Sequence, residues 1–278
     1  MTALREAMME TLLHHRLTGQ PVDAGPTLLL IHPLGAALDF WDACLPAWEP
    51  HLPCLAVDLR SAGASPPGAQ PPGLDRHVED LEALRAALGL PALLPVGCAM
   101  GSMVAAAYTA RHPDRVPALV LSNPTPSSGE SARAMLEARA KAVRAGGMAA
   151  ILPEAVERPF SAQPRDARYA RYLAGFAAQD AAAYADAVQG FSAADISADL
   201  PRIRCPVLLV AGRHDLLLPP VLAEEVQRLL PEGLARLEID EEGAHFLPYQ
   251  QPERFTARVL DFLGPVAGPN LRQKDGNA

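Results

Sequence analysis

Three residues at the ends of apolar segments have the types and the chain order of a hydrolytic triad, except that the first of them is alanine. Gly97-Cys98-Ala99-Met100-Gly101 follows an apolar run and precedes a run of small residues, which is the context of a G-x-S-x-G nucleophile turn. Asp215 and His245 come later, in the order acid and then base. A carboxylate that orients an imidazole allows it to act as a general base. The pattern therefore predicts acid–base chemistry with no hydroxyl at the nucleophile position, Ala99.

Acyl chemistry also needs hydrogen-bond donors for the oxyanion that develops on the substrate. The residue after the nucleophile position is Met100, and its backbone N–H is one expected donor. The second is expected from Leu34, in the loop His32-Pro33-Leu34-Gly35 that follows the first apolar run. We therefore predict an oxyanion hole made by Leu34 and Met100, and a packing role for His32.

Two neighbours of Ala99 carry nucleophilic side chains, but neither suits the turn. If Cys98 were the central residue, the flanking positions would be Val96 and Met100, and both glycines would be lost. Ser102 lies three residues beyond Ala99, in the first turn of the expected helix, so its side chain should point elsewhere. We expect Cys98 to be a small buried residue.

Short apolar runs predict the strands that position these residues, because strands buried on both faces of a parallel sheet are continuously apolar. Helical spacing predicts helices between them at 74–88, 100–112, 219–230 and 252–263. The alternation of strands and helices along the chain favours an α/β class with a mostly parallel twisted sheet and helices on both faces. The six runs are Thr27–Ile31, Cys54–Val57, Leu93–Val96, Ala118–Leu121, Pro206–Val210 and the weaker Leu234–Ile239.

One segment breaks this alternation. Residues 127–200 are rich in Ala, Arg and Glu at helical spacing and contain no good strand, which indicates a helical cap. We expect an α/β core formed by 1–126 and 201–265, with the cap at 127–200. The polar residues 266–278 are expected to form a flexible tail.

Composition excludes several classes of partner. The 278 residues carry a net charge of -8 and no run of Lys or Arg, which disfavours nucleic-acid binding. No apolar stretch approaches the ~18 residues of a membrane span, and none in the first twenty residues suits a signal peptide. The sequence shows no metal-ligand spacing and no nucleotide-binding motif. We expect a cytoplasmic protein with a small-molecule substrate, no cofactor and no metal; the oligomeric state stays open.

Together these motifs resemble the α/β-hydrolase superfamily, and within it the 3-oxoadipate enol-lactonase group. The resemblance implies the α/β-hydrolase fold, a carboxylic ester or lactone hydrolase, and the roles of acid for Asp215 and base for His245. Alanine at position 99 departs from the pattern, as do Pro33 and Ser102, where glycines are common. The stretches most similar to the lactonase group are 32–42, 58–65, 111–116 and 142–148.

Several residues are candidates for substrate contacts. The cap arginines Arg139, Arg144 and Arg158 would suit a substrate carboxylate, which a lactone acid would require. Trp41 is a candidate to line an apolar pocket together with Phe40 and aromatic residues of the cap, and core packing is the alternative role for these side chains.

Alanine at position 99 leaves three hypotheses, which the sequence favours in this order. In the first, an enzyme acts on a small activated carbonyl substrate (an enol lactone, an ester or a β-dicarbonyl) with His245 as general base and no covalent intermediate. In the second, the chain is a serine ester or lactone hydrolase whose serine was replaced by alanine. In the third, it is a non-catalytic binding protein that kept the pocket.

Overall fold

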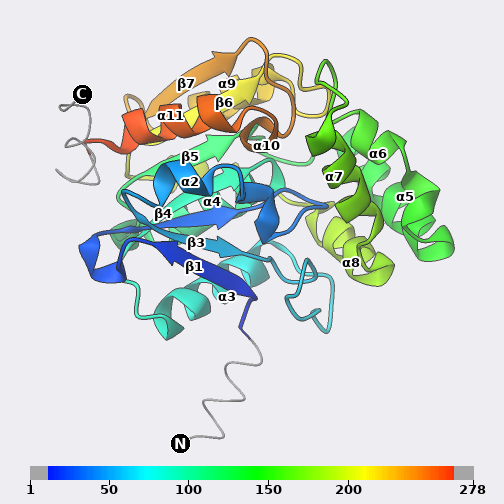
Figure 1. The fold of residues 1–278 in the computed structure, drawn as a ribbon, viewed down its shortest axis with the longest axis horizontal. Helices are drawn as coiled ribbons and strands as arrows, with labels where there is room; N and C mark the ends of the chain where they lie inside the picture. Colours follow the sequence, from blue (N-terminus) through cyan, green and yellow to red (C-terminus); the bar gives the residue numbers. More distant parts are fainter. Residues whose placement is uncertain (1–11, 266–278) are drawn as a thin grey trace, which may run out of the picture.

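A twisted seven-stranded sheet forms the centre of the computed structural model, which describes residues 12–265 (Figure 1). The strand order is β1-β3-β2-β4-β5-β6-β7. Strands β2 to β7 are parallel, and β1 pairs antiparallel with β3 at one edge. The strands are β1 His15–Gly19, β2 Thr27–Ile31, β3 Pro53–Val57, β4 Leu93–Cys98, β5 Leu119–Ser122, β6 Val207–Gly212 and β7 Ala235–Asp240.

Helices cover both faces of the sheet and bury two separate apolar clusters. One cluster contains Trp48 of α2 and Phe255 of α11, and the other contains Leu81 of α3, Tyr108 of α4 and Val226 of α9. Burial on both faces explains why the strands are continuously apolar. The core helices are α2 Leu45–Trp48, α3 Leu74–Ala87, α4 Met100–Arg111, α9 Pro220–Leu229, α10 Leu247–Gln250 and α11 Pro252–Leu263.

A group of helices between β5 and β6 lies together to one side of the core (Figure 1). The Tyr172 hydroxyl (3.2 Å) and the Gln179 amide (2.6 Å) of this group both donate to the carbonyl oxygen of Gly35, in the loop after β2. The group therefore rests on the loops at the C-terminal ends of the strands, where a cap is expected. Its helices are α5 Glu130–Gly146, α6 Glu154–Glu157, α7 Ala167–Ala177 and α8 Ala181–Phe191.

The six predicted strands and four predicted core helices are all present, with ends shifted by at most two residues. Strand β1 was not predicted, because its sequence HRLTG is polar and its residues are only partly buried at the sheet edge. The expected tail, 266–278, lies outside the described residues.

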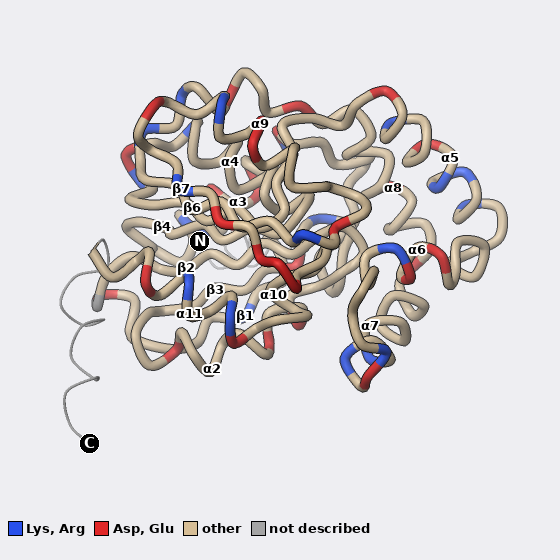
Figure 2. Tube along the Cα trace, turned by 90° about the horizontal axis from the view of Figure 1, so that it is seen from above, with Lys and Arg blue, Asp and Glu red and all other residues tan. Residues whose placement is uncertain are grey.

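Charged residues of both signs are interspersed over the core and the cap, as Figure 2 shows. No helix within residues 12–265 is long and apolar enough to cross a membrane. Within the same residues, no three His, Cys, Asp or Glu side chains are grouped to hold a metal ion.

Two glycines allow α4 to pack closely on the strands. A Cβ at Gly97 would lie 2.2 Å from the carbonyl oxygen of Gly101, and a Cβ at Gly101 would lie 2.3 Å from that of Ile31 in β2. Both distances are far shorter than a van der Waals contact. The start of α4, and with it position 99, is therefore fixed by backbone packing against β2 and β4.

We expect Gly101→Ala to lower the free energy of unfolding by about 1–3 kcal/mol, because the added methyl overpacks this contact. Gly175→Ala is the matched control, since Gly175 is also helical and an added Cβ there meets nothing within 4 Å. Gly175→Ala should raise the free energy of unfolding by about 0.5–1 kcal/mol. Urea unfolding measures both, and equal effects of the two variants would contradict the packing argument.

Candidate active site

Asp215 and His245 form a buried pair above the ends of β6 and β7. His245 Nδ1 lies 2.8 Å from Asp215 Oδ2, and the residues are 7% and 2% exposed. A carboxylate only accepts hydrogen bonds, so Nδ1 carries the proton that joins them. In the neutral imidazole, Nε2 is then the nitrogen with the free lone pair. No hydrogen bond joins Nε2 to another residue in the described part of the chain, and this nitrogen is available as a base.

The Asp215 carboxylate receives three further hydrogen bonds. The backbone N–H groups of Leu217 and Leu218 donate to Oδ1 at 2.8 and 2.9 Å, and the Asn123 amide donates to Oδ2 at 2.8 Å. Burial by itself raises the pKa of Asp215, but the neighbouring His245 and the backbone hydrogen bonds from Leu217 and Leu218 lower it below its ordinary value. Asp215 is therefore a carboxylate anion that can orient and stabilise an imidazolium.

Asn123 is a site residue that the sequence analysis did not identify. It directly follows β5, has a left-handed backbone (φ 50°), and also donates to the carbonyl oxygen of Ala244 at 3.2 Å. Its position at the end of the strand beside β6 is the signal that could have revealed it. Asn123 joins the acid loop to the histidine loop and holds the carboxylate rotamer.

Ala99 occupies a sharp turn between β4 and α4. Its backbone has φ 51° and ψ −113°, which costs on the order of 1–3 kcal/mol for a residue other than glycine. The Ala99 N–H donates to Ser122 O at 2.8 Å, and the Ser102 N–H donates to Ala99 O at 2.9 Å. This is the geometry that a nucleophile elbow requires, with a methyl group as the side chain.

A cavity of about 150 Å³ brings the predicted groups together. Ala99, Met100, Leu34 and His245 all line it, and Asp215 lies behind His245. We call this the site cavity. Met100 is the first residue of α4, and the first N–H groups of a helix have no partner within it. The walls are otherwise mostly apolar, which strengthens electrostatic interactions inside.

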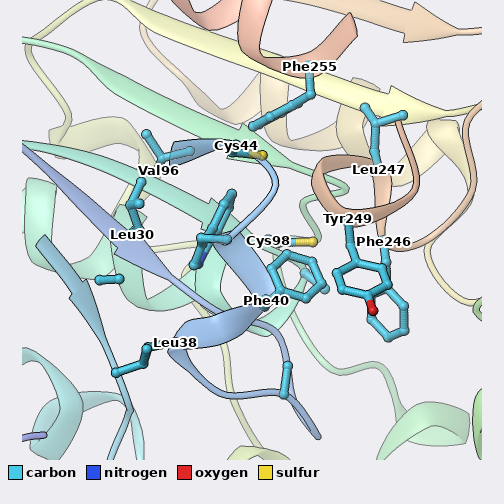
Figure 3. Close-up of a cluster of buried hydrophobic side chains, with 14 of the residues drawn as sticks. Leu30, Leu38, Phe40, Cys44, Val96, Cys98, Phe246, Leu247, Tyr249 and Phe255 are labelled. Atoms are coloured by element: carbon cyan, nitrogen blue, oxygen red, sulfur yellow. The ribbon is translucent and has the colours of Figure 1, made fainter. Parts of the chain in front are cut away.

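The other nucleophilic side chains near Ala99 do not reach the site cavity. Cys98 points into an apolar cluster beside Phe40 and Tyr249 (Figure 3), and burial raises the pKa of its thiol well above the ordinary value. The Ser102 hydroxyl is fully buried and lies 2.9 Å from Gly97 O and 2.8 Å from Ser122 O, so it is committed to backbone carbonyls. Neither residue is placed to act as a nucleophile.

His32 has the packing role predicted for it. Its Nε2 accepts from the Leu59 N–H at 3.0 Å, so Nδ1 carries the proton and donates to Pro33 O at 2.8 Å. Burial lowers the pKa of His32, which keeps it neutral. His32 thus ties the loop that carries Leu34 to the loop after β3.

Trp41, Arg144 and Arg158, the expected substrate contacts, are not among the residues that line the site cavity. Trp41 is fully buried among aromatic residues between the sheet and α11. Arg144 pairs with Asp186 at 2.5 Å, and Arg158 is exposed to solvent. Arg139, five residues before Arg144 in α5, is the cap arginine that lines the cavity.

A larger outer cavity of about 650 Å³ lies between the cap and the loops that follow β2 and β3. Neither Ala99 nor His245 lines it. Tyr172 and Phe176 of α7 line both this cavity and the site cavity, so they form the partition between the two.

Comparison with known proteins agrees with this architecture. The family model described as "alpha/beta hydrolase fold" matches residues 26–146. A protein of Caulobacter sp. named "Putative carbamate hydrolase RutD" is 29% identical over 266 residues, covering 92% of this chain and 97% of the relative.

Solved structures give the same result over most of the chain. An enol-lactonase from Burkholderia xenovorans superposes with a TM-score of 0.80 at 26% identity, covering 91% of this chain and 96% of that one. An esterase from Thermogutta terrifontis superposes with a TM-score of 0.82 at 24% identity, covering 92% of this chain and 94% of that one. This chain has the α/β-hydrolase fold. The enol-lactonase is one structural neighbour among several hydrolases, so the similarity is broader than the lactonase group alone.

The lowered pKa of Asp215 predicts how stability depends on pH. Its contribution to the free energy of unfolding is present above the unfolded-state pKa, about 4, and is lost as pH falls through the lower folded-state value. We expect stability to fall below about pH 4 and Asp215→Asn to reduce that slope. Urea unfolding between pH 2.5 and 7 measures it, with the exposed Asp114→Asn as control. A wild-type slope in the Asp215 variant would contradict this assignment.

Proposed function

We propose that this chain is a hydrolase of small activated acyl compounds in which His245 activates water directly, without an acyl-enzyme intermediate. The observation that carries the proposal is the intact Asp215–His245 pair, which faces a cavity where position 99 has no hydroxyl. Loss of the hydroxyl leaves room for a water molecule between Ala99 and His245. Relatives named as a carbamate hydrolase, an enol-lactonase and an esterase support carbonyl hydrolysis as the reaction class.

In this mechanism the water oxygen bonds to the substrate carbonyl carbon while His245 Nε2 takes a proton from the water. The backbone N–H groups of Leu34 and Met100 stabilise the oxyanion, and Asp215 stabilises the imidazolium. The tetrahedral intermediate then expels the leaving group, which receives the proton from His245. One water is consumed, and a carboxylic acid and a protonated leaving group are released.

The size of these effects limits the substrate class. General acid–base catalysis contributes about 10²–10⁴-fold, and an oxyanion donor about 10²–10³-fold. These factors suffice for an activated carbonyl such as an enol lactone, an aryl ester or a β-dicarbonyl. They are too small for an unactivated amide.

Arg139 favours substrates that carry an anionic group. Apart from His245, Arg139 is the one ionisable residue among the described residues that line the site cavity. No Asp or Glu within residues 12–265 pairs with it. Its guanidinium lies near the phenols of Tyr172 and Tyr184; burial raises the pKa of Tyr184, and Arg139 opposes that rise. A substrate carboxylate could occupy the space in front of this cation.

We expect the chain to turn over nitrophenyl acetate and a small enol lactone, and His245→Ala to lower kcat by about 10²–10⁴-fold. Ala99→Ser should not raise kcat, because the mechanism has no use for the hydroxyl. Steady-state kinetics of the three proteins measures this. Turnover by the Ser variant alone would favour a serine hydrolase that has lost its nucleophile. A ligand bound tightly and recovered unchanged would favour a binding protein.

We expect Arg139→Gln to raise KM at least about tenfold for a substrate that carries a carboxylate, since hydrogen bonds between charged groups are strong. KM for the methyl ester of the same substrate should stay unchanged. Arg133→Gln is the matched control, because Arg133 is exposed on the same helix and pairs with Glu137 at 3.0 Å. Equal effects on both substrates would contradict an anion-binding role.

A further inference from the structure

A small chamber of about 10 Å³ lies behind the loop that carries Leu34. We call it the inner chamber. Its lining includes Leu34 and Met100 on one side and Ser61 and His77 on the other. The volume corresponds to about one water molecule.

Two of its polar side chains are buried without a partner in the described residues. His77, on α3, is 1% exposed and stacks on Phe191, and neither of its ring nitrogens has a hydrogen bond. Ser61 is 4% exposed, and its hydroxyl has none either. Burial lowers the pKa of His77 to about 4, so the ring is neutral and offers one donor and one acceptor. Buried polar groups in native proteins are nearly always satisfied by protein or by ordered water.

The other histidine of the inner chamber is already satisfied. His32 uses both ring nitrogens, on Pro33 O and on the Leu59 N–H. Arg60 and Gln179 also line the inner chamber, but Arg60 pairs with Asp80 and the Gln179 amide donates to Gly35 O. The partnerless His77 and Ser61 are therefore the groups best placed to hold a molecule there. A single water can bridge them, because it both donates and accepts hydrogen bonds.

The inner chamber is bounded by residues that it shares with both larger cavities. Leu34 and Met100 also line the site cavity, and Ser61 and Gly35 also line the outer cavity. It thus lies between the two, directly behind the expected oxyanion donors. Leu34 and Met100 form the wall between the inner chamber and the site cavity, so a water held in the inner chamber lies next to the site cavity.

We propose that His77 and Ser61 hold a water molecule in the inner chamber, and that this water site supplies the site cavity during hydrolysis. The supply role rests on the proposed function, because that mechanism consumes one free water in each turnover. His77 and Ser61 are positioning residues here, since they act on the water and not on the substrate.

The test uses the full chain and the variants His77→Phe and Ser61→Ala. A crystal structure of the wild type should show an ordered water within hydrogen-bond distance of His77 and Ser61, and His77→Phe should lack it. His77→Phe should lower kcat for hydrolysis about three- to tenfold with KM unchanged. Hydroxylamine is a nucleophile too large for the inner chamber, so its reaction with the same substrate should keep the wild-type rate.

His112→Phe is the matched control, because His112 also packs beside an aromatic ring, that of Tyr108 at 4.8 Å, and does not line the inner chamber. It should leave both rates unchanged. Ser61→Ala should also lower kcat for hydrolysis, so the test remains valid if His77→Phe does not fold. An inner chamber empty of water in the wild type would overturn the proposal.

Two kinetic outcomes would also overturn the supply role: an unchanged kcat for hydrolysis in both variants, or an equal loss of the hydrolysis and hydroxylamine rates. If the wild type turns over no ester or lactone, the proposed function fails. The crystal structures then decide the water site by themselves, in its favour if the water is present and against it if the inner chamber is empty.

Discussion

The hydrogen bonds to the buried Asp215 carboxylate fix the protonation and direction of the His245 imidazole, which lines the site cavity. Two backbone N–H groups and the Asn123 amide hold the anion, so its remaining acceptor position faces His245 Nδ1. The proton on Nδ1 leaves Nε2 as the base. Parallel strands β5 and β6, together with β7, make this possible because their C-terminal ends meet at one edge of the sheet.

The backbone at Ala99 complements this pair. The left-handed turn positions the first N–H of α4 at the site cavity, and the close packing at Gly97 and Gly101 maintains it. The strained backbone does not depend on the side chain at position 99, which explains how the site geometry persists with alanine. In the proposed mechanism, a methyl group there leaves the proposed oxyanion donors Leu34 and Met100 in place and leaves space beside His245 for water.

Much of the fold and part of the site could be predicted from the sequence. The strands were found because burial on both faces makes them apolar, and the order of Ala99, Asp215 and His245 identified the strand ends that meet. Edge strand β1 carries no apolar run and was missed. Asn123 was missed because an Asn-Pro step at a strand end is common in loops that have no function.

The substrate contacts were the least predictable part. Arg139 and Arg144 are five residues apart on α5 with the same chemistry, yet one lines the site cavity and the other pairs with Asp186. Trp41 was expected at the pocket and is instead covered by α2 and α11. These directions depend on how the cap packs on the core. The inner chamber likewise is lined by side chains of segments far apart in the chain, so no local sequence pattern predicts it.

The central claim is that water, activated by His245, attacks the substrate with no acyl-enzyme. Intact-protein mass spectrometry on samples quenched during the first turnover of an activated ester tests it most directly. The account predicts product formation while the protein mass stays that of the unmodified chain. A mass increase equal to the acyl group, appearing at the rate of product formation, would contradict it and would reveal a nucleophile elsewhere in the site.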